Sequence, residues 1–230
     1  MQIKHLLLVV GLSVGFVTGI FAQHKRVKIK NGIGIHGGIT QYDISTDNFM
    51  TSKGNGYLGG LTATVDLPHK WYTVSYGMQF ADNNFSIQGR PNVDSDVNFS
   101  SEDLEYNIKV VQLAFLFHVK VFTPVVSIDL GPQLQYNSQL ELQDDGKKGY
   151  VLSGFDGLLA DDITGINHLN INGLAGVSAG IGAFRLRARY SYGITNMFNE
   201  LNKEDLNTAP SDEKFEGHQQ MLSFSLMITL

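Results

Sequence analysis

Cysteine is absent from the 230-residue chain. Its absence excludes disulfides, thiolate metal sites, cysteine nucleophiles and a lipid anchor on an N-terminal cysteine. Proline is scarce, with 5 residues, and Lys and Arg (17) are fewer than Asp and Glu (22). Nucleic-acid binders usually carry a basic patch, so this mildly acidic chain is expected to have no nucleic-acid partner. Glycine is plentiful, with 25 residues, and aromatics make up 10%, which suits β-strands and turns.

A long apolar run occurs only near the N-terminus, from Leu6 to Ile20. Lys4 precedes it, and Ala22 places a small residue just before Gln23. The alternative, a membrane-spanning helix, prefers ~20 apolar residues. The shorter run and the small residue after it favour a cleavable signal peptide over residues 1–22. The remainder is then a soluble protein outside the cytoplasm or a β-barrel.

Alternation with a period of two is the strongest signal in the chain. Between Phe184 and Tyr192 every even position is apolar or aromatic and every odd position is polar. Successive side chains of a strand point to opposite faces, so this segment predicts a strand with one apolar face and one arginine-bearing face. A helix would scatter the same charges around its axis.

The same alternation recurs along the chain and predicts eight strands. In the fourth, the apolar phase slips at Val110-Val111, which predicts a β-bulge there. The expected strands cover residues 28–44, 57–67, 72–80, 104–121, 126–137, 168–181, 184–192 and 221–230.

The connections between these strands alternate between short and long. Tight turns are expected at 68–69, 123–124 and 182–183, and long loops at 45–55, 81–103, 140–166 and 196–217. Bacterial outer-membrane barrels have short periplasmic turns and longer extracellular loops. We therefore predict an all-β fold, an eight-stranded antiparallel up-and-down transmembrane β-barrel over residues 23–230. It would lie in the cell outer membrane with outer-membrane lipids as partners, and closure would leave no strand edge unpaired.

Aromatic residues fall near the expected strand ends, where girdles meet the membrane interfaces. They are Tyr57, Trp71, Tyr72, Tyr136, Tyr192 and Phe198.

The arginine-bearing face is the candidate site. An unpaired charge in a dry core is very costly, so a polar lumen with inward acids is expected. The predicted lumenal charge cluster comprises Arg185, Arg187, Arg189, Asp129, Asp66 and Glu105. It could bind an anion or help one to cross. The interior of an eight-stranded barrel is just wide enough for side chains to fill it, which favours a ladder of structural salt bridges.

Signals for catalysis and metal binding are missing. GxSxG occurs at residues 11–15 and 176–180, within the expected signal peptide and within an expected strand, so neither forms the strand-to-helix elbow of a nucleophilic serine. The chain has no HExxH motif, and its seven histidines do not cluster. We therefore expect no catalytic residues, no metal site and no cofactor, and hence no enzyme. The acidic residues of the long loops are interpreted as a solvated surface.

The segment Arg189–Asn196 resembles the RYxYGLTN signature of the PorT-like outer-membrane β-barrel family. The stretch Val126 to Tyr136, with Gly131-Pro132, is similar to that family's fifth strand. Leu230 departs from the usual pattern, since barrel-assembly signals generally end in an aromatic residue. The resemblance implies an outer-membrane location in a Bacteroidetes-type bacterium. Some relatives are tied to protein secretion, so the family implies no single activity.

The sequence thus predicts a non-enzymatic outer-membrane barrel with a structural or surface-interaction role, or an accessory of secretion machinery. Its protein partners would lie in the outer membrane or periplasm. One alternative is a narrow barrel for transport or permeation of small anionic solutes. Another is a periplasmic lipocalin-like ligand binder, which would need its apolar face inside.

Overall fold

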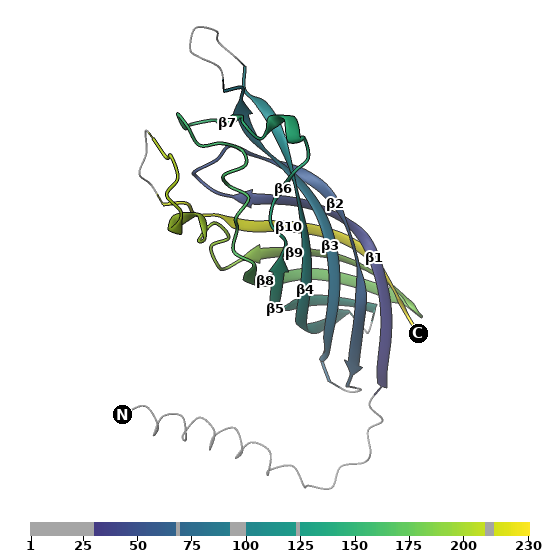
Figure 1. The fold of residues 1–230 in the computed structure, drawn as a ribbon. Helices are drawn as coiled ribbons and strands as arrows, with labels where there is room; N and C mark the ends of the chain where they lie inside the picture. Colours follow the sequence, from purple (N-terminus) through teal and green to yellow (C-terminus); the bar gives the residue numbers. More distant parts are fainter. Residues whose placement is uncertain (1–29, 68–69, 93–99, 123–124, 210–213) are drawn as a thin grey trace, which may run out of the picture.

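The computed structural model describes residues 30–67, 70–92, 100–122, 125–209 and 214–230. Eight long antiparallel strands form a ring (Figure 1). They are β1 (Lys30–Ser45), β2 (Thr51–Asp66), β3 (Tyr72–Arg90), β4 (Glu102–Phe122), β5 (Val126–Asn137), β8 (Leu169–Ile181), β9 (Phe184–Gly193) and β10 (His218–Thr229).

The ring closes because the first and last strands pair. β1 and β10 are hydrogen-bonded from Gly34↔Thr229 to Ser45↔His218, and each remaining long strand pairs with its neighbours in chain order. No edge of the ring is left open among the described residues. The prediction of an eight-stranded antiparallel up-and-down barrel is confirmed.

The two ends of the barrel differ. The start of β1, the end of β10 and the β8–β9 turn lie together at one end, here called the turn end (Figure 1). The β8–β9 turn holds Gly182 at φ +62°, a left-handed conformation that glycine adopts without strain. The expected turns at 68–69 and 123–124, and the expected signal peptide 1–22, lie outside the described residues.

The opposite, loop end carries the long connections. The short strands β6 (Glu141–Leu142) and β7 (Val151–Leu152) and the 3-10 turns η2 (Asp145–Lys147) and η3 (Leu201–Lys203) lie in them. β6 pairs with β4, and β7 with β3, so one connection folds back onto the barrel wall. We call the segments 46–50, 138–167, 194–209 and 214–217 the cap.

Several strands extend further toward the loop end than the sequence predicted. β3 continues to Arg90 rather than Phe80, and β2 begins at Thr51 rather than Tyr57. The cause is a reversal of side-chain polarity along each strand. Near the turn end the inward side chains are polar and the outward ones apolar, whereas near the loop end the inward side chains are apolar.

This reversal also explains the apparent phase slip in β4. Ile108 and Val110 point inward and Val111 points outward, with the next inward residue being Gln112. Pairing with β3 and β5 is continuous through both valines, so the predicted bulge at Val110-Val111 is wrong. Register shifts occur instead between Lys53 and Gly56 and between Lys120 and Phe122.

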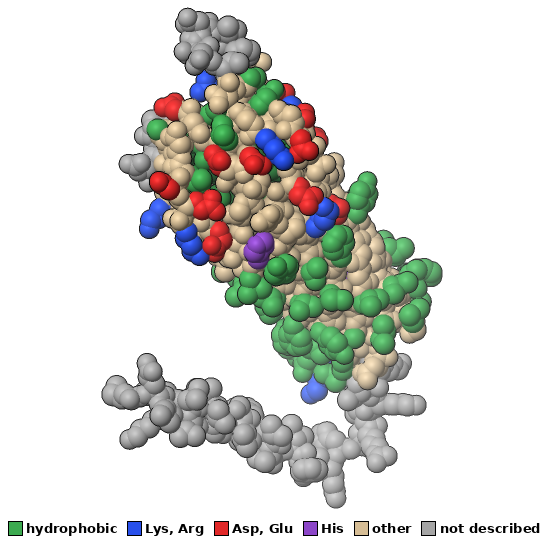
Figure 2. Space-filling model, viewed as in Figure 1, with side chains coloured by type: hydrophobic (Ala, Val, Ile, Leu, Met, Phe, Trp, Pro, Cys, Tyr) green, Lys and Arg blue, Asp and Glu red, His purple; other side chains and the backbone are tan. Residues whose placement is uncertain are grey.

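The outer wall near the turn end is apolar. Figure 2 shows hydrophobic side chains gathered on this half of the visible face and charged ones on the other half. Large exposed apolar residues there include Ile33, Leu61, Tyr76, Leu113, Phe115, Leu134 and Leu186. Such a band fits the hydrocarbon core of a membrane. Among the described residues, no helix has the length and apolar character needed to cross a membrane.

The expected aromatic girdle is partly present. Tyr57, Trp71 and Tyr136 are exposed on the outer wall. Phe198 was wrongly assigned to it, because this ring is 0% exposed and packs inside the cap.

Candidate functional site: the barrel lumen

Side chains fill the lumen in three successive layers along the inward positions of the strands. Near the turn end lies a charged layer centred on Asp129 and the arginines of β9. A layer of side-chain amides follows toward the loop end. Beyond it, an apolar cluster joins the barrel to the cap. Because alternate residues of every strand face inward, each layer combines side chains from strands distant in sequence.

Asp129 is the centre of the charged layer and is 0% exposed. Its Oδ2 accepts hydrogen bonds from Arg189 Nε (3.1 Å) and Nη2 (2.8 Å). Its Oδ1 accepts from His118 Nδ1 (2.6 Å) and from the hydroxyls of Ser127 (3.2 Å) and Ser178 (3.1 Å). Five donors thus surround one buried carboxylate, which compensates the loss of hydration that burial imposes.

The other two arginines of the row have different surroundings. Arg185 Nη1 donates to Ser178 (3.2 Å) and Ser127 (3.5 Å). Arg187 is 3% exposed, and its Nη1 donates to Thr62 at 3.5 Å. Its Nε and Nη2 are buried without an acceptor among the described residues. Arg187 therefore keeps two directional donors that none of the described residues satisfies.

The predicted acids do not all join the arginines. Asp66 lies on the inner wall at the turn end and accepts hydrogen bonds from Lys120 Nζ (2.7 Å) and Thr73 Oγ1 (3.0 Å). Glu105 is a correction, because it is exposed on the outer face of β4 in the loop half. The polarity reversal places it there, since Leu104 and Tyr106 on either side point inward.

Sequence reasoning did not assign Lys120 to the cluster. A signal was available in the spacing. Lys120 lies two residues after His118 and eight after Gln112, so all three share the inward face of β4. The predicted bulge at Val110-Val111 lies before all three residues and did not hide this series.

The amide layer closes the lumen above the charged layer. Gln79 donates to Gln112 (2.5 Å), which donates to Gln135 (2.5 Å). Gln219 on β10 donates to Gln135 across the lumen at 2.8 Å. The inner amides that make up or flank this layer are Asn83, Gln133, Asn137, Asn170 and Asn172. The connected run of four glutamines crosses the lumen, whereas Asn83 Nδ2, Gln133 Nε2 and Asn172 Oδ1 are buried without a partner among the described residues.

The apolar cluster fastens the cap to the barrel. Phe49 contacts three other rings, edge-on to Phe198 (5.3 Å between centroids), stacked on Phe215 (5.5 Å) and tilted to Phe155 (5.8 Å). These four rings come from three different connections between strands. Below them, Tyr106 donates its hydroxyl to Ala160 O at 2.9 Å.

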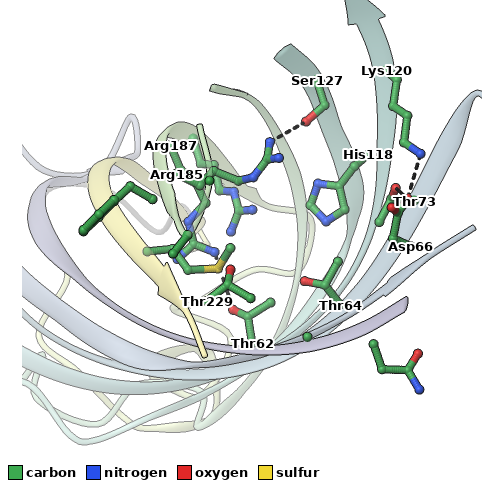
Figure 3. A pocket seen from close by; sticks show the side chains of 17 residues that line it. Thr62, Thr64, Asp66, Thr73, His118, Lys120, Ser127, Arg185, Arg187 and Thr229 are labelled. Atoms are coloured by element: carbon green, nitrogen blue, oxygen red, sulfur yellow. Dashed lines mark hydrogen bonds and ion pairs between the residues drawn. The ribbon is translucent and has the colours of Figure 1, made fainter. Parts of the chain in front are cut away.

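A cavity of about 350 Å³ lies at the turn end, below the charged layer (Figure 3). Arg185 and Arg187 reach it from β9, and His118 and Lys120 from β4. Thr62 and Thr64 of β2 line its wall. The β8–β9 turn and Thr229 also line it, which places its mouth at the turn end. No group of three or more potential metal ligands occurs within the described parts of the chain.

The signature segment Arg189–Asn196 holds several of these layers together. Arg189 binds Asp129, and Tyr192 stacks on His218 at 5.6 Å between centroids. The Asn196 side chain accepts from the amides of Phe198 and Gly217 and donates to Phe215 O, each at 2.9 Å. The segment therefore links the charged layer to the cap.

A closed antiparallel ring with an apolar outer band and a polar inner wall defines a transmembrane β-barrel. A lipocalin-like binder requires the opposite arrangement, with its apolar face inside. Residues 21–199 match the family described as outer membrane protein beta-barrel domain. The chain belongs to this family and is a protein of the cell outer membrane.

Solved structures of low sequence identity were also found. Neisserial surface protein A is 11% identical, with 88% of this chain and 99% of that chain covered and a TM-score of 0.48. Ail, the attachment invasion locus protein of Yersinia pestis, is 11% identical, with 87% and 99% covered and a TM-score of 0.41. The curated proteins include no match to this chain.

Proposed function

We propose that this protein is a non-enzymatic, non-conducting outer-membrane barrel whose folded cap serves as an interaction surface on the cell exterior. The observation that carries the proposal is the buried phenylalanine group of Phe49, Phe155, Phe198 and Phe215, which joins three connections above a closed lumen.

The packed cap supports a role in recognition because it is already ordered before a partner binds. Ordering a loop at the moment of binding costs conformational entropy, and a cap that is already ordered avoids most of that cost. Its outer face carries charged side chains of both signs (Figure 2), including the pairs Lys148–Asp145 and Lys203–Glu200. A preorganised polar surface suits contact with another macromolecule outside the membrane.

Site-specific photo-crosslinking in whole cells tests the interaction surface. A photoreactive residue placed at exposed Lys148 or Asp205 of the cap should form discrete adducts with protein. The same residue at Leu113, on the apolar outer wall, is the control and should label lipid. Cap positions that give no adduct, or the same lipid adducts as Leu113, would contradict the proposal.

The second candidate, permeation of small anionic solutes, is favoured by the arginines at the turn end. The amide layer and the apolar cluster oppose it, because both lie across the path of a solute. Planar-bilayer recordings should therefore show no steady single-channel current. A steady current that falls in the Arg187→Gln variant would instead favour permeation.

We further propose that the protein belongs to the PorT-like group and assists secretion machinery. Support comes from the segment Arg189–Asn196, which in this chain connects the lumen to the cap. Protein partners would then lie in the outer membrane or periplasm. Deleting the gene should impair export of secreted proteins, and unchanged export would refute this assignment while leaving the barrel's cap function open to the crosslinking test.

A further inference from the structure

The cavity at the turn end has an excess of positive charge. Of the described residues that line it, four are basic (Lys120, Arg185, Arg187 and Arg189) and one is acidic (Asp66). The other nearby acid, Asp129, is already held by Arg189. Among the described residues, this group therefore holds four basic side chains and two acidic ones.

Arg187 shows where a negative group would bind. Its guanidinium is buried, it borders the cavity, and Nε and Nη2 have no acceptor among the described residues. These two nitrogens form one edge of the guanidinium plane. Arg189 uses the same edge to hold the carboxylate of Asp129. A planar pair of donors of this kind matches two oxygens of a carboxylate or phosphate.

We propose that this cavity binds a phosphate group, free or as the end of a small phosphate ester, which enters from the turn end. Arg187 grips two phosphate oxygens, while Arg185 and Lys120 supply further positive charge. A lining with more basic than acidic side chains favours a dianion over a singly charged carboxylate. The amide layer blocks the far side, so the cavity is a dead-end binding site open toward the periplasm.

The site is distinct from the interaction surface of the cap. It lies at the opposite end of the barrel, and no cap residue lines it. A ligand bound there would bridge β9 to β2 and β4 and stabilise the folded barrel by mass action.

Calorimetric titration of the purified barrel tests the proposal, in a maltoside detergent that carries no phosphate. Inorganic phosphate and glycerol 3-phosphate are the two ligands, and acetate is the monoanion comparison. Arg187→Gln removes the charge and leaves a shorter polar side chain. Arg90→Gln makes the same change at the exposed loop end of β3 and is the matched control.

Phosphate should bind the wild type and Arg90→Gln alike, and bind Arg187→Gln at least about thirtyfold more weakly, because a buried charge pair has lost one partner. Tighter binding of glycerol 3-phosphate than of inorganic phosphate would identify the ligand as an ester, and the reverse as the free ion. Absence of phosphate binding to the wild type, or equal binding to Arg187→Gln, overturns the site. Should Arg187→Gln fail to fold, Lys120→Gln at the cavity wall must weaken phosphate binding, and unchanged affinity in that variant overturns the site equally.

Discussion

Replacing Asp129 with Asn should destabilise the barrel far more than the same change at Asp66. Asp129 is 0% exposed and accepts five hydrogen bonds, two of them from Arg189. An asparagine can keep its oxygen toward Arg189, and the serine hydroxyls can rotate to face the new amide nitrogen. The negative charge is lost, however, and Arg189 is left beside Arg187 without a counter-charge.

The expected cost follows from this geometry. Removing one partner of a buried ion pair costs about 3–5 kcal/mol in soluble proteins. Water in the adjacent cavity can solvate Arg189 in part, so we expect a cost at the lower end of this range, about 3 kcal/mol. Asp66 and its partner Lys120 are partly exposed, and such pairs contribute about 0–1 kcal/mol. The two Asp→Asn variants should therefore differ by about 2 kcal/mol or more.

Equilibrium unfolding by urea in lipid vesicles measures both variants. Trp71 is the single tryptophan of the chain and is exposed on the outer wall at the turn end. Its fluorescence therefore reports the transfer of the barrel wall out of the membrane. A loss below about 1 kcal/mol in Asp129→Asn, or equal losses in the two variants, would refute the central role assigned to Asp129. In the Asp129→Asn background, Arg189→Gln should recover part of the loss, because the two residues are coupled.

Three further predictions concern the cap and a turn. Phe198→Ala should lower the free energy of cap opening by about 3–5 kcal/mol. Hydrogen exchange should then be faster for the backbone amides of residues 138–167, and unchanged exchange would contradict the packing of Phe198 on Phe49. Gly182→Val should cost about 1–2 kcal/mol because φ is +62° there, and unaltered unfolding in urea would argue against a strained turn. Lys147 donates a hydrogen bond to Glu102 and lowers the pKa of that exposed carboxyl below its ordinary 4.5. The stability that this ion pair contributes is therefore fully present above pH 4.5 and is lost as the pH falls through the lowered pKa. Carboxyl NMR titration should show the Glu102 midpoint rising toward 4.5 in Lys147→Gln, and an unmoved midpoint would exclude the pair.

Strand identity was readable because alternation is a local property of the chain. The arginines of β9 occupy every second position, and this spacing alone fixes them on one face. The number of strands, the short turns and the long connections followed from the same period. These features require no knowledge of which strand is adjacent to which.

The position of each face relative to membrane and lumen was only partly readable. In β4 the period continues unbroken, but the apolar side changes from inside to outside between Val110 and Val111. A sequence pattern shows which face of a strand is apolar. It cannot distinguish a bulge from a strand that leaves the membrane and exchanges its apolar outer face for an apolar inner one. That ambiguity produced the wrong bulge, the shortened β3 and the inward assignment of Glu105.

Taken by itself, the sequence determined the period-two strands, their count and the charged face of β9, because neighbouring residues alone set these. Only the tertiary structure decided that Asp129 binds Arg189, that Asp66 binds Lys120 and that Phe198 is buried in the cap. Each of these contacts joins strands or connections far apart in the chain. They depend on ring closure, on register and on where the barrel leaves the membrane, and no short stretch of sequence contains that information.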